Sequence, residues 1–167
     1  MAFSKVVCTF NPEKSDPNRT RITISGQNIK YPGDVVTNTV SLDLLKHLLS
    51  IFLSCKGAKF VTFDIKNFYL RTPLDRPEYV RIKLADIPQD FIEKYDLNNF
   101  VDANGWVYFH IHNGIYGLPQ SGALAHALLE KHLKVYDYYQ CPLTPGLWRH
   151  TWCPITFSLL VEDFVVE

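Results

Sequence analysis

Three acidic residues stand in segments where acids are uncommon. Asp64 interrupts the β-prone run F-V-T-F-D-I, so we expect it on or just past a buried strand. Glu162 and Asp163 are neighbours between L-L-V and F-V-V. A carboxylate in an apolar setting is costly unless it is paired, hydrogen-bonded or bound to a metal ion. Carboxylates that converge at the edge of a sheet can hold Mg²⁺ ions, and two such ions promote in-line phosphoryl or nucleotidyl transfer. The three acids are therefore candidates for a catalytic metal site.

Other interpretations of the polar residues remain open. Adjacent strand residues point to opposite faces, so Glu162 and Asp163 can share a site only across a tight turn. They could instead form an ordinary hairpin turn, with Asp64 an isolated, hydrogen-bonded acid. A hydrolase that uses Asp64 and Glu162 as acid and base is a further alternative. His110 and His112 alternate on one predicted strand, but no third ligand has a convincing spacing, so we do not expect a metal there.

The elements that would position the acids alternate between strands and helices. Strand patterns cover residues 19–24, 60–65, 79–84, 106–111 and 156–161, and residues 29–31 could pair with the first of them. Helix patterns run from the N-cap residue Ser41 to about Gly57, over residues 89–95, and over residues 120–136. Because strands and helices interleave, we expect an α/β or α+β fold, with helices packed against a mainly antiparallel sheet.

The bulk composition is that of one globular domain. The 167 residues are 47% apolar and 14% aromatic, no apolar run reaches the length of a membrane span, and the N-terminal segment lacks the apolar core of a signal peptide. The four cysteines show no C-x-x-C spacing, so we expect reduced thiols and an intracellular location, cytoplasmic or nuclear.

The charge is distributed unevenly although its sum is zero. Residues 1–80 carry 11 Lys and Arg against 7 Asp and Glu, a balance of +4, and residues 81–167 carry 6 against 10, a balance of −4. A basic first half fits contact with phosphates, and chance asymmetry on a solvated surface explains it equally well.

Three motifs in order resemble the palm of a reverse transcriptase. They are F-D-I-K-N-F-Y-L at residues 63–70, Y-G-L-P-Q-S-G at 116–122 and L-V-E-D-F at 160–164. The chain is most similar to the polymerase region of long-terminal-repeat retrotransposons of the copia type, and R-T-R-I-T-I-S-G and T-P-G-L-W extend the resemblance over nearly the whole chain. The resemblance implies one domain over residues 1–167, fingers-like at about 1–60 and 75–115 and palm-like at 60–74 and 116–167.

The resemblance also implies roles for single residues. Asp64 matches the first catalytic aspartate, which holds two Mg²⁺ ions together with the acids at 162 and 163. Tyr69 matches the aromatic gate that fills the space of a 2′-hydroxyl and so selects deoxynucleotides. Arg21 matches the arginine that grips the triphosphate, and Gln120 the glutamine that positions nucleotide and template. Two glycines of the second motif let the backbone approach the substrate: Gly117 and Gly122.

The third motif departs from the family pattern, which has two aspartates. Glu162 takes the place of the first, metal-binding aspartate, and Asp163 keeps the second place. Glutamate moves the carboxylate outward by one methylene, about 1.5 Å of bond length, and misplacing a catalytic group by about 1 Å can cost roughly a hundredfold in rate. Val165 also stands where a glycine is expected.

We therefore expect a truncated copy that is inactive alone. The family reaction adds deoxynucleotides to a primer on an RNA or DNA template. The chain ends four residues after Asp163, so we expect no thumb and only part of the palm, with the ribonuclease H and integrase of the polyprotein missing. The alternative is a non-catalytic retroelement remnant, which acts at most as a nucleic-acid-binding module.

Overall fold

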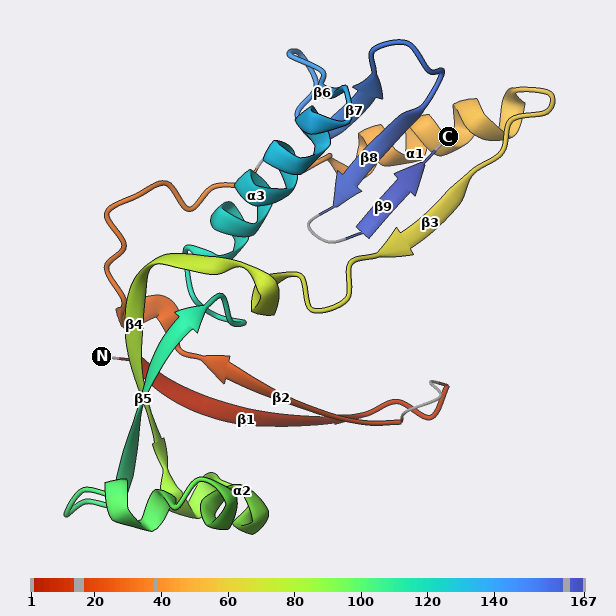
Figure 1. Cartoon of the computed structure of the whole chain (residues 1–167). Coiled ribbons are helices and arrows are strands. Elements are labelled where there is room, and N and C mark those ends of the chain that lie inside the picture. The colour runs from red at the N-terminus through yellow and green to blue at the C-terminus, as the bar shows by residue number, and fades with distance from the viewer. Residues whose placement is uncertain (1, 14–16, 38, 161–162, 167) are drawn as a thin grey trace. The chain divides into compact units, whose positions relative to one another are not determined.

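A computed structural model describes residues 2–13, 17–37, 39–160 and 163–166 of the chain. Over these residues the chain has a mixed α+β structure, which confirms the expected class (Figure 1). It divides into two compact units, each made from two separate segments. Unit 1 contains Met1–Val35 and Tyr69–Ser121, and unit 2 contains Val36–Phe68 and Gly122–Glu167. Each unit has its own sheet and its own core.

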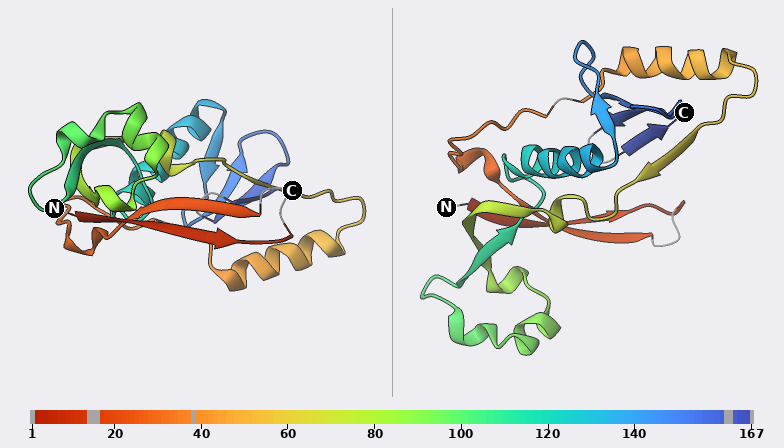
Figure 2. Two further views of the ribbon diagram at one scale, coloured as in Figure 1. Left: turned by 90° about the horizontal axis from the view of Figure 1, so that it is seen from below. Right: turned by 45° about the horizontal axis from the view of Figure 1, so that its top comes forward.

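The sheet of unit 1 has the strand order β2-β1-β4-β5. Its strands are β1 (Ala2–Phe10), β2 (Asn18–Ile24), β4 (Pro73–Lys83) and β5 (Trp106–Asn113). β1 and β2 form a long antiparallel pair, visible from two directions in Figure 2, and β4 pairs antiparallel with β5. The link between the two pairs is parallel, with Ala2 opposite Val80 and Phe3 opposite Arg81.

Short helical segments complete unit 1. They are η1 (Gly26–Asn28), η2 (Tyr69–Arg71), η3 (Leu84–Asp86), α2 (Gln89–Lys94) and η4 (Leu97–Phe100). The last three lie between β4 and β5 in the sequence, and Figure 1 shows them at the far end of that strand pair. Ile92 and Leu97 pack there with Val107 in one apolar cluster, while Ile24, Val80 and Leu118 form the other cluster of the unit.

The sheet of unit 2 has the strand order β3-β9-β8-β7-β6, and every pairing in it is antiparallel. Its strands are β3 (Val61–Asp64), β6 (Tyr138–Gln140), β7 (Leu147–His150), β8 (Thr156–Leu160) and β9 (Asp163–Val166). Its helices are α1 (Leu42–Ser54) and α3 (Ser121–Val135). They cover opposite faces of the sheet, because Leu129 and Leu133 of α3 pack on Trp148 and Phe157, whereas α1 packs on the adjacent, opposite-facing Leu147.

The helix and strand patterns in the sequence agree largely with these elements. The Ser41 hydroxyl accepts a hydrogen bond of 3.3 Å from the Leu44 amide and so caps α1, as expected. α1 ends at Ser54, shortly before Gly57, whose φ is +85°.

The prediction that residues 29–31 pair with β2 is wrong. These residues form no strand, and β2 pairs with β1 from Asn18 opposite Phe10 to Ile24 opposite Ser4. A run of three residues offers few ladder hydrogen bonds, whereas the N-terminal segment offers a register of seven residue pairs. The pairing of β1 was not predicted.

None of the helices in the described parts of the chain is long and apolar enough to cross a membrane.

Candidate functional site

Two of the three candidate acids lie opposite each other in unit 2. Asp64 is the last residue of β3 and Asp163 the first of β9, and the two are register partners in the antiparallel pair. Directly opposite residues of such a pair have Cα atoms about 4.5–5.5 Å apart. Asp163 also lies opposite Leu160 of β8, so β8 and β9 form a hairpin. Glu162 lies outside the described residues, and Asp163 is described here only by its backbone.

The expectation that Asp64 belongs to a buried strand is wrong. All four residues of β3 are exposed, and Val61 and Phe63 retain 55% and 48% of their accessible surface. β3 is an edge strand of its sheet, and an apolar run does not distinguish an edge strand from a central one. Burial therefore does not explain an acid at position 64, and the feature that sets Asp64 apart is its pairing with a second acid, Asp163.

Arg21 and Tyr69 come together in unit 1 through a third residue, Tyr116. The guanidinium carbon of Arg21 lies 5.4 Å from the centre of the Tyr116 ring. The Tyr69 and Tyr116 rings meet edge to face, with centroids 5.2 Å apart at 85°. We call these three residues the Tyr116 cluster. Tyr116 opens the second sequence motif, but its linking position was not predicted, because it depends on contacts between segments distant in sequence.

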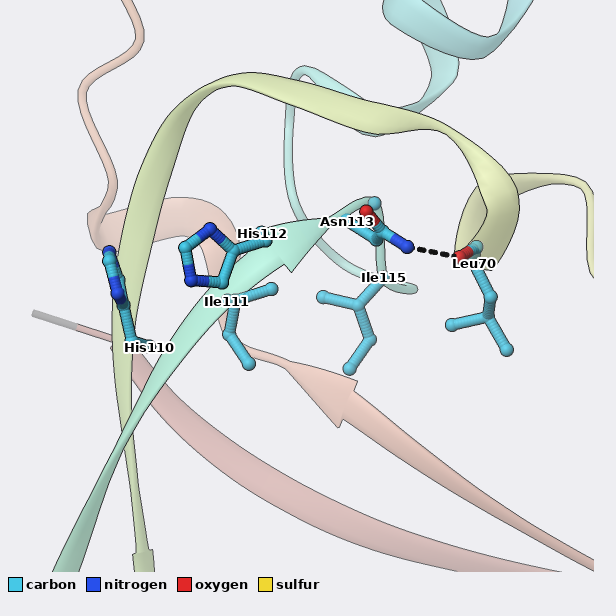
Figure 3. A pocket seen from close by; sticks show the side chains of 7 residues that line it. Leu70, His110, Ile111, His112, Asn113 and Ile115 are labelled. Atoms are coloured by element: carbon cyan, nitrogen blue, oxygen red, sulfur yellow. Dashed lines mark hydrogen bonds between the residues drawn. The ribbon is translucent and has the colours of Figure 1, made fainter.

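The backbone of Tyr69 is held by the end of β5. The Thr72 amide donates to the Tyr69 carbonyl at 3.0 Å, and the Gly114 amide donates to the Thr72 carbonyl at 2.7 Å. A Cβ on Gly114 would stand 2.6 Å from the Tyr69 carbonyl oxygen, so this approach requires glycine. The Asn113 side chain adds a 3.1 Å bond to the Leu70 carbonyl (Figure 3). Tyr69, at the start of η2, is thus fixed by contacts of its backbone as well as by the contact of its ring with Tyr116.

Gln120 is fully buried in unit 1, with 0% of its surface exposed. Its Nε2 donates to Oε1 of Glu78 at 3.0 Å, and Nε of Arg76 donates to the same oxygen at 3.0 Å. The side-chain oxygen of Gln120, Oε1, has no hydrogen-bond partner among the described residues. Glu78 therefore orients the side-chain amide of Gln120, and the buried Oε1 of that amide is left without a partner. The sequence offered no signal for Glu78 beyond an acid next to the strand predicted at residues 79–84.

The two glycines of the second motif differ in what they permit. Gly117 has φ of +94°, and a Cβ there would stand 1.9 Å from the Ile24 carbonyl oxygen. The close approach in the structure is thus to β2, where the Ile24 amide also donates to the Tyr116 carbonyl at 2.8 Å. A Cβ on Gly122 would meet the Thr37 methyl group at 3.5 Å, an ordinary contact. Contact of either glycine with a substrate stays a prediction.

The available donors suit a hard cation in unit 2. Carboxylate oxygens are the ligands that Mg²⁺ prefers, and the paired positions 64 and 163 both carry carboxylates. Among the described residues no three His, Cys, Asp or Glu side chains gather closely enough to hold a metal ion; Glu162 and the Asp163 side chain do not belong to that set.

The edge of β5 carries a shallow, open pocket of about 360 Å³ (Figure 3). Leu70 of η2 lines it together with residues 110–115. The rings of His110 and His112 lie 4.2 Å apart between centroids. The pocket therefore combines apolar and imidazole surfaces.

Comparison of the chain with models of known protein families, with curated protein sequences and with solved structures found no match.

Proposed function

We propose that this chain is a reverse transcriptase domain of a long-terminal-repeat retrotransposon of the copia type, with unit 1 as the core of the fingers and unit 2 as the core of the palm. The family reaction is a nucleotidyl transfer that adds deoxynucleotides to the 3′ end of a primer on an RNA or DNA template. It would proceed inside the cell, where deoxynucleoside triphosphates are available. The observation that carries the proposal is the pairing of Asp64 with Asp163. These residues belong to motifs far apart in sequence, and a polymerase palm requires them to be neighbours.

In this proposal Asp64 and Asp163 supply carboxylate oxygens from adjacent strands. Mg²⁺ ions held there would neutralise the charge that develops on the transferred phosphoryl group and activate the primer hydroxyl. The exposed position of Asp64 at the end of an edge strand leaves it accessible to a triphosphate. The acids would bind the metal ions, and the primer hydroxyl would be the nucleophile, so no protein nucleophile is required.

The Tyr116 cluster supports the proposed nucleotide contacts in unit 1. Arg21 has a planar guanidinium suited to phosphate oxygens, and its contact with the Tyr116 ring limits its freedom. Tyr69 contacts the same Tyr116 ring edge to face. A gate must be rigid to exclude a 2′-hydroxyl, and the backbone contacts of Tyr69 with Gly114 provide that rigidity.

Gln120 would act from within the unit. Because Nε2 of Gln120 already donates to Glu78, the side-chain Oε1 is the atom left to accept a hydrogen bond. Because Gln120 is completely buried, it would act by holding Glu78 in place and not by touching the nucleotide.

We further propose that this copy has little or no polymerase activity. Glu162 stands where the family has a metal-binding aspartate, and the longer side chain displaces its carboxylate. Near-octahedral Mg²⁺ sites tolerate such a change poorly.

A reversion experiment tests the proposal. The full chain, its Glu162→Asp variant and the double variant Glu162→Asp/Asp64→Ala are compared for Mg²⁺-dependent extension of a labelled primer on an RNA template. We expect the reversion to raise Mg²⁺-dependent extension over the starting chain by up to about a hundredfold, and the double variant to abolish that gain. Mg²⁺-dependent binding of a labelled deoxynucleoside triphosphate is measured in parallel.

Two results would overturn the proposal. One is extension that is unaffected by Asp64→Ala. The other is the absence of both extension and Mg²⁺-dependent nucleotide binding in the reverted chain, together with a normal circular dichroism spectrum.

A further inference from the structure

The outer face of the β4–β5 pair carries an unusual set of side chains. In the antiparallel register Tyr79 lies opposite His110, Arg81 opposite Tyr108, and Lys83 opposite Trp106. Opposite residues, and every second residue along a strand, share one face. The alternate residues Val80, Ile82 and Val107 are buried in the core. We call the outward set the aromatic strip: Tyr79, Arg81, Lys83, Trp106, Tyr108 and His110.

One end of the aromatic strip is a stack of rings. Tyr79 and His110 are nearly parallel, with centroids 4.6 Å apart at 9°, and the His112 ring follows at 4.2 Å from His110. Tyr79 keeps 55% of its surface exposed and Tyr108 keeps 44%. Isolated exposed aromatic residues are common on proteins, but an ordered row of them on one sheet face marks a binding surface.

The other end combines rings with cations. The Arg81 guanidinium carbon lies 4.4 Å from the Phe3 ring centre and 4.5 Å from that of Trp106. Its Nε is buried without a hydrogen-bond partner among the described residues. The Lys83 ammonium group lies 5.3 Å from the Trp106 ring centre. Both cations thus lie against aromatic faces, and among the described residues neither forms an ion pair with a carboxylate, so their charge remains available to an anion.

The carboxylate of Asp102 interacts electrostatically with Arg81 and is hydrogen-bonded to nearby residues. It accepts hydrogen bonds from the amides of Trp106 and Asn104 at 2.9 and 2.8 Å and from the Tyr108 hydroxyl at 2.9 Å. The bond from Trp106, those from Tyr108 and Asn104, and the charge of Arg81 lower the pKa of Asp102. The carboxylate therefore orders the Trp106 and Tyr108 end of the strip.

We propose that the aromatic strip binds single-stranded nucleic acid. The exposed rings of Tyr79, Tyr108 and His110 can stack on unpaired bases, while Arg81 and Lys83 meet the phosphates. A duplex hides its base faces and would use the cations only. An acidic peptide would satisfy the cations but leave the ring stack unused. The strip shares no residue with the proposed polymerase set, so the inference goes beyond the proposed function and is tested separately.

The test measures fluorescence anisotropy of a labelled oligothymidine of about twelve nucleotides, in EDTA and without nucleotides. Tyr79→Leu keeps an apolar side chain but removes the ring, and we expect the affinity to fall roughly five- to hundredfold. Tyr79→Phe should restore it. Lys83→Ala should reduce the dependence of log affinity on log salt by about 0.7. A hairpin duplex of the same length should bind more weakly than the single strand.

The chain offers a matched control on α2. Tyr95 is 54% exposed, and the Lys94 ammonium group lies 5.2 Å from its ring centre, much as Lys83 lies by Trp106. Tyr95→Leu and Lys94→Ala should leave oligothymidine binding unchanged. Equal losses from Tyr95→Leu and Tyr79→Leu, no loss from Tyr79→Leu, or equal binding of duplex and single strand would each overturn the inference. So would strip variants that change only the self-association of the chain in size-exclusion chromatography.

Discussion

The two units hold their candidate residues by different means. In unit 2 the backbone pairing of β3 with β9 aligns Asp64 and Asp163. In unit 1 the candidate residues are held by side-chain contacts and by close approaches of the backbone. Tyr69 contacts Tyr116, and the backbone of Gly117 lies against Ile24. A position aligned by backbone hydrogen bonds keeps its place when its side chain changes. A position held by a glycine contact or a buried amide does not.

This difference predicts where sequence change would be tolerated. Acids aligned by strand pairing should be replaceable with little effect on folding. In unit 1 the same residues serve the fold and the proposed nucleotide contacts, so a change there affects both.

The largest effect is expected from Gly117→Ala in unit 1. The new Cβ would overlap the Ile24 carbonyl oxygen at 1.9 Å, at a residue whose φ is +94°. Because backbone must move to relieve the overlap, we expect a loss of more than about 4 kcal/mol of unfolding free energy. Urea unfolding of the full chain followed by circular dichroism measures it, and hydrogen exchange assigns the loss to β1 and β2.

Two other glycines serve as controls for this prediction. Gly57 has φ of +85° but no atom within 4 Å of a new Cβ, so Gly57→Ala should cost only about 1–2 kcal/mol. Gly122 lies in α3 with an ordinary contact, and Gly122→Ala should stabilise by up to about 1 kcal/mol. If Gly117→Ala behaved like Gly57→Ala, the contact with β2 would not determine the fold of unit 1.

An intermediate effect is expected from Leu159→Ala in unit 2. Leu159 is fully buried on β8 and packs in one cluster with Trp148 and Phe157. The cavity should cost about 2–5 kcal/mol. Hydrogen exchange should show the lost protection in β7, β8 and α3, while β4 and β5 stay protected at short exchange times. Leu143→Ala, at a side chain with 95% exposure, should have almost no effect. Equal loss of protection in both units would contradict the separation of their cores.

The smallest effect concerns pH and unit 2. Burial lowers the pKa of His126 on α3, against a weaker opposing effect of Glu130. A depressed pKa means that the folded state favours the neutral ring. The contribution of the neutral His126 ring to the unfolding free energy is present above the ordinary histidine pKa of about 6.5. It is lost as the pH falls from there through the lower pKa of the folded state. Between about pH 7 and pH 5 the urea midpoint should therefore fall less in His126→Gln than in the unchanged chain. His132→Gln, at an exposed site, should leave the pH dependence unchanged.

The predictable parts of the fold are those with strong local signals. The capping serine and the leucine spacing located α1, and alternation located β2 and the paired ends of β4 and β5. β1 was missed because its significance depends on two partners, one of them the distant β4. The exposure of β3 was missed because the sequence of one strand does not predict whether that strand lies at the edge or in the middle of its sheet.

The candidate site shows the same limit. The order of the motifs led to positions 64 and 163, which the structure pairs. The partnership of Gln120 with Glu78 and the linking ring of Tyr116 are contacts between distant segments, and no local pattern encodes them. The polymerase roles of these residues stay predictions.

The parallel contact between β1 and β4 sets the order in which the protein can mature on the ribosome. Unit 1 needs Tyr69–Ser121 to complete the sheet that Met1–Val35 begins. At a synthesis rate of about 5–20 residues per second, one edge of β1 waits for seconds without its neighbour. An unpaired strand edge is a template for wrong pairing. The start of β1 therefore stays without its β4 partner during the interval in which the intervening segment of unit 2 is being made.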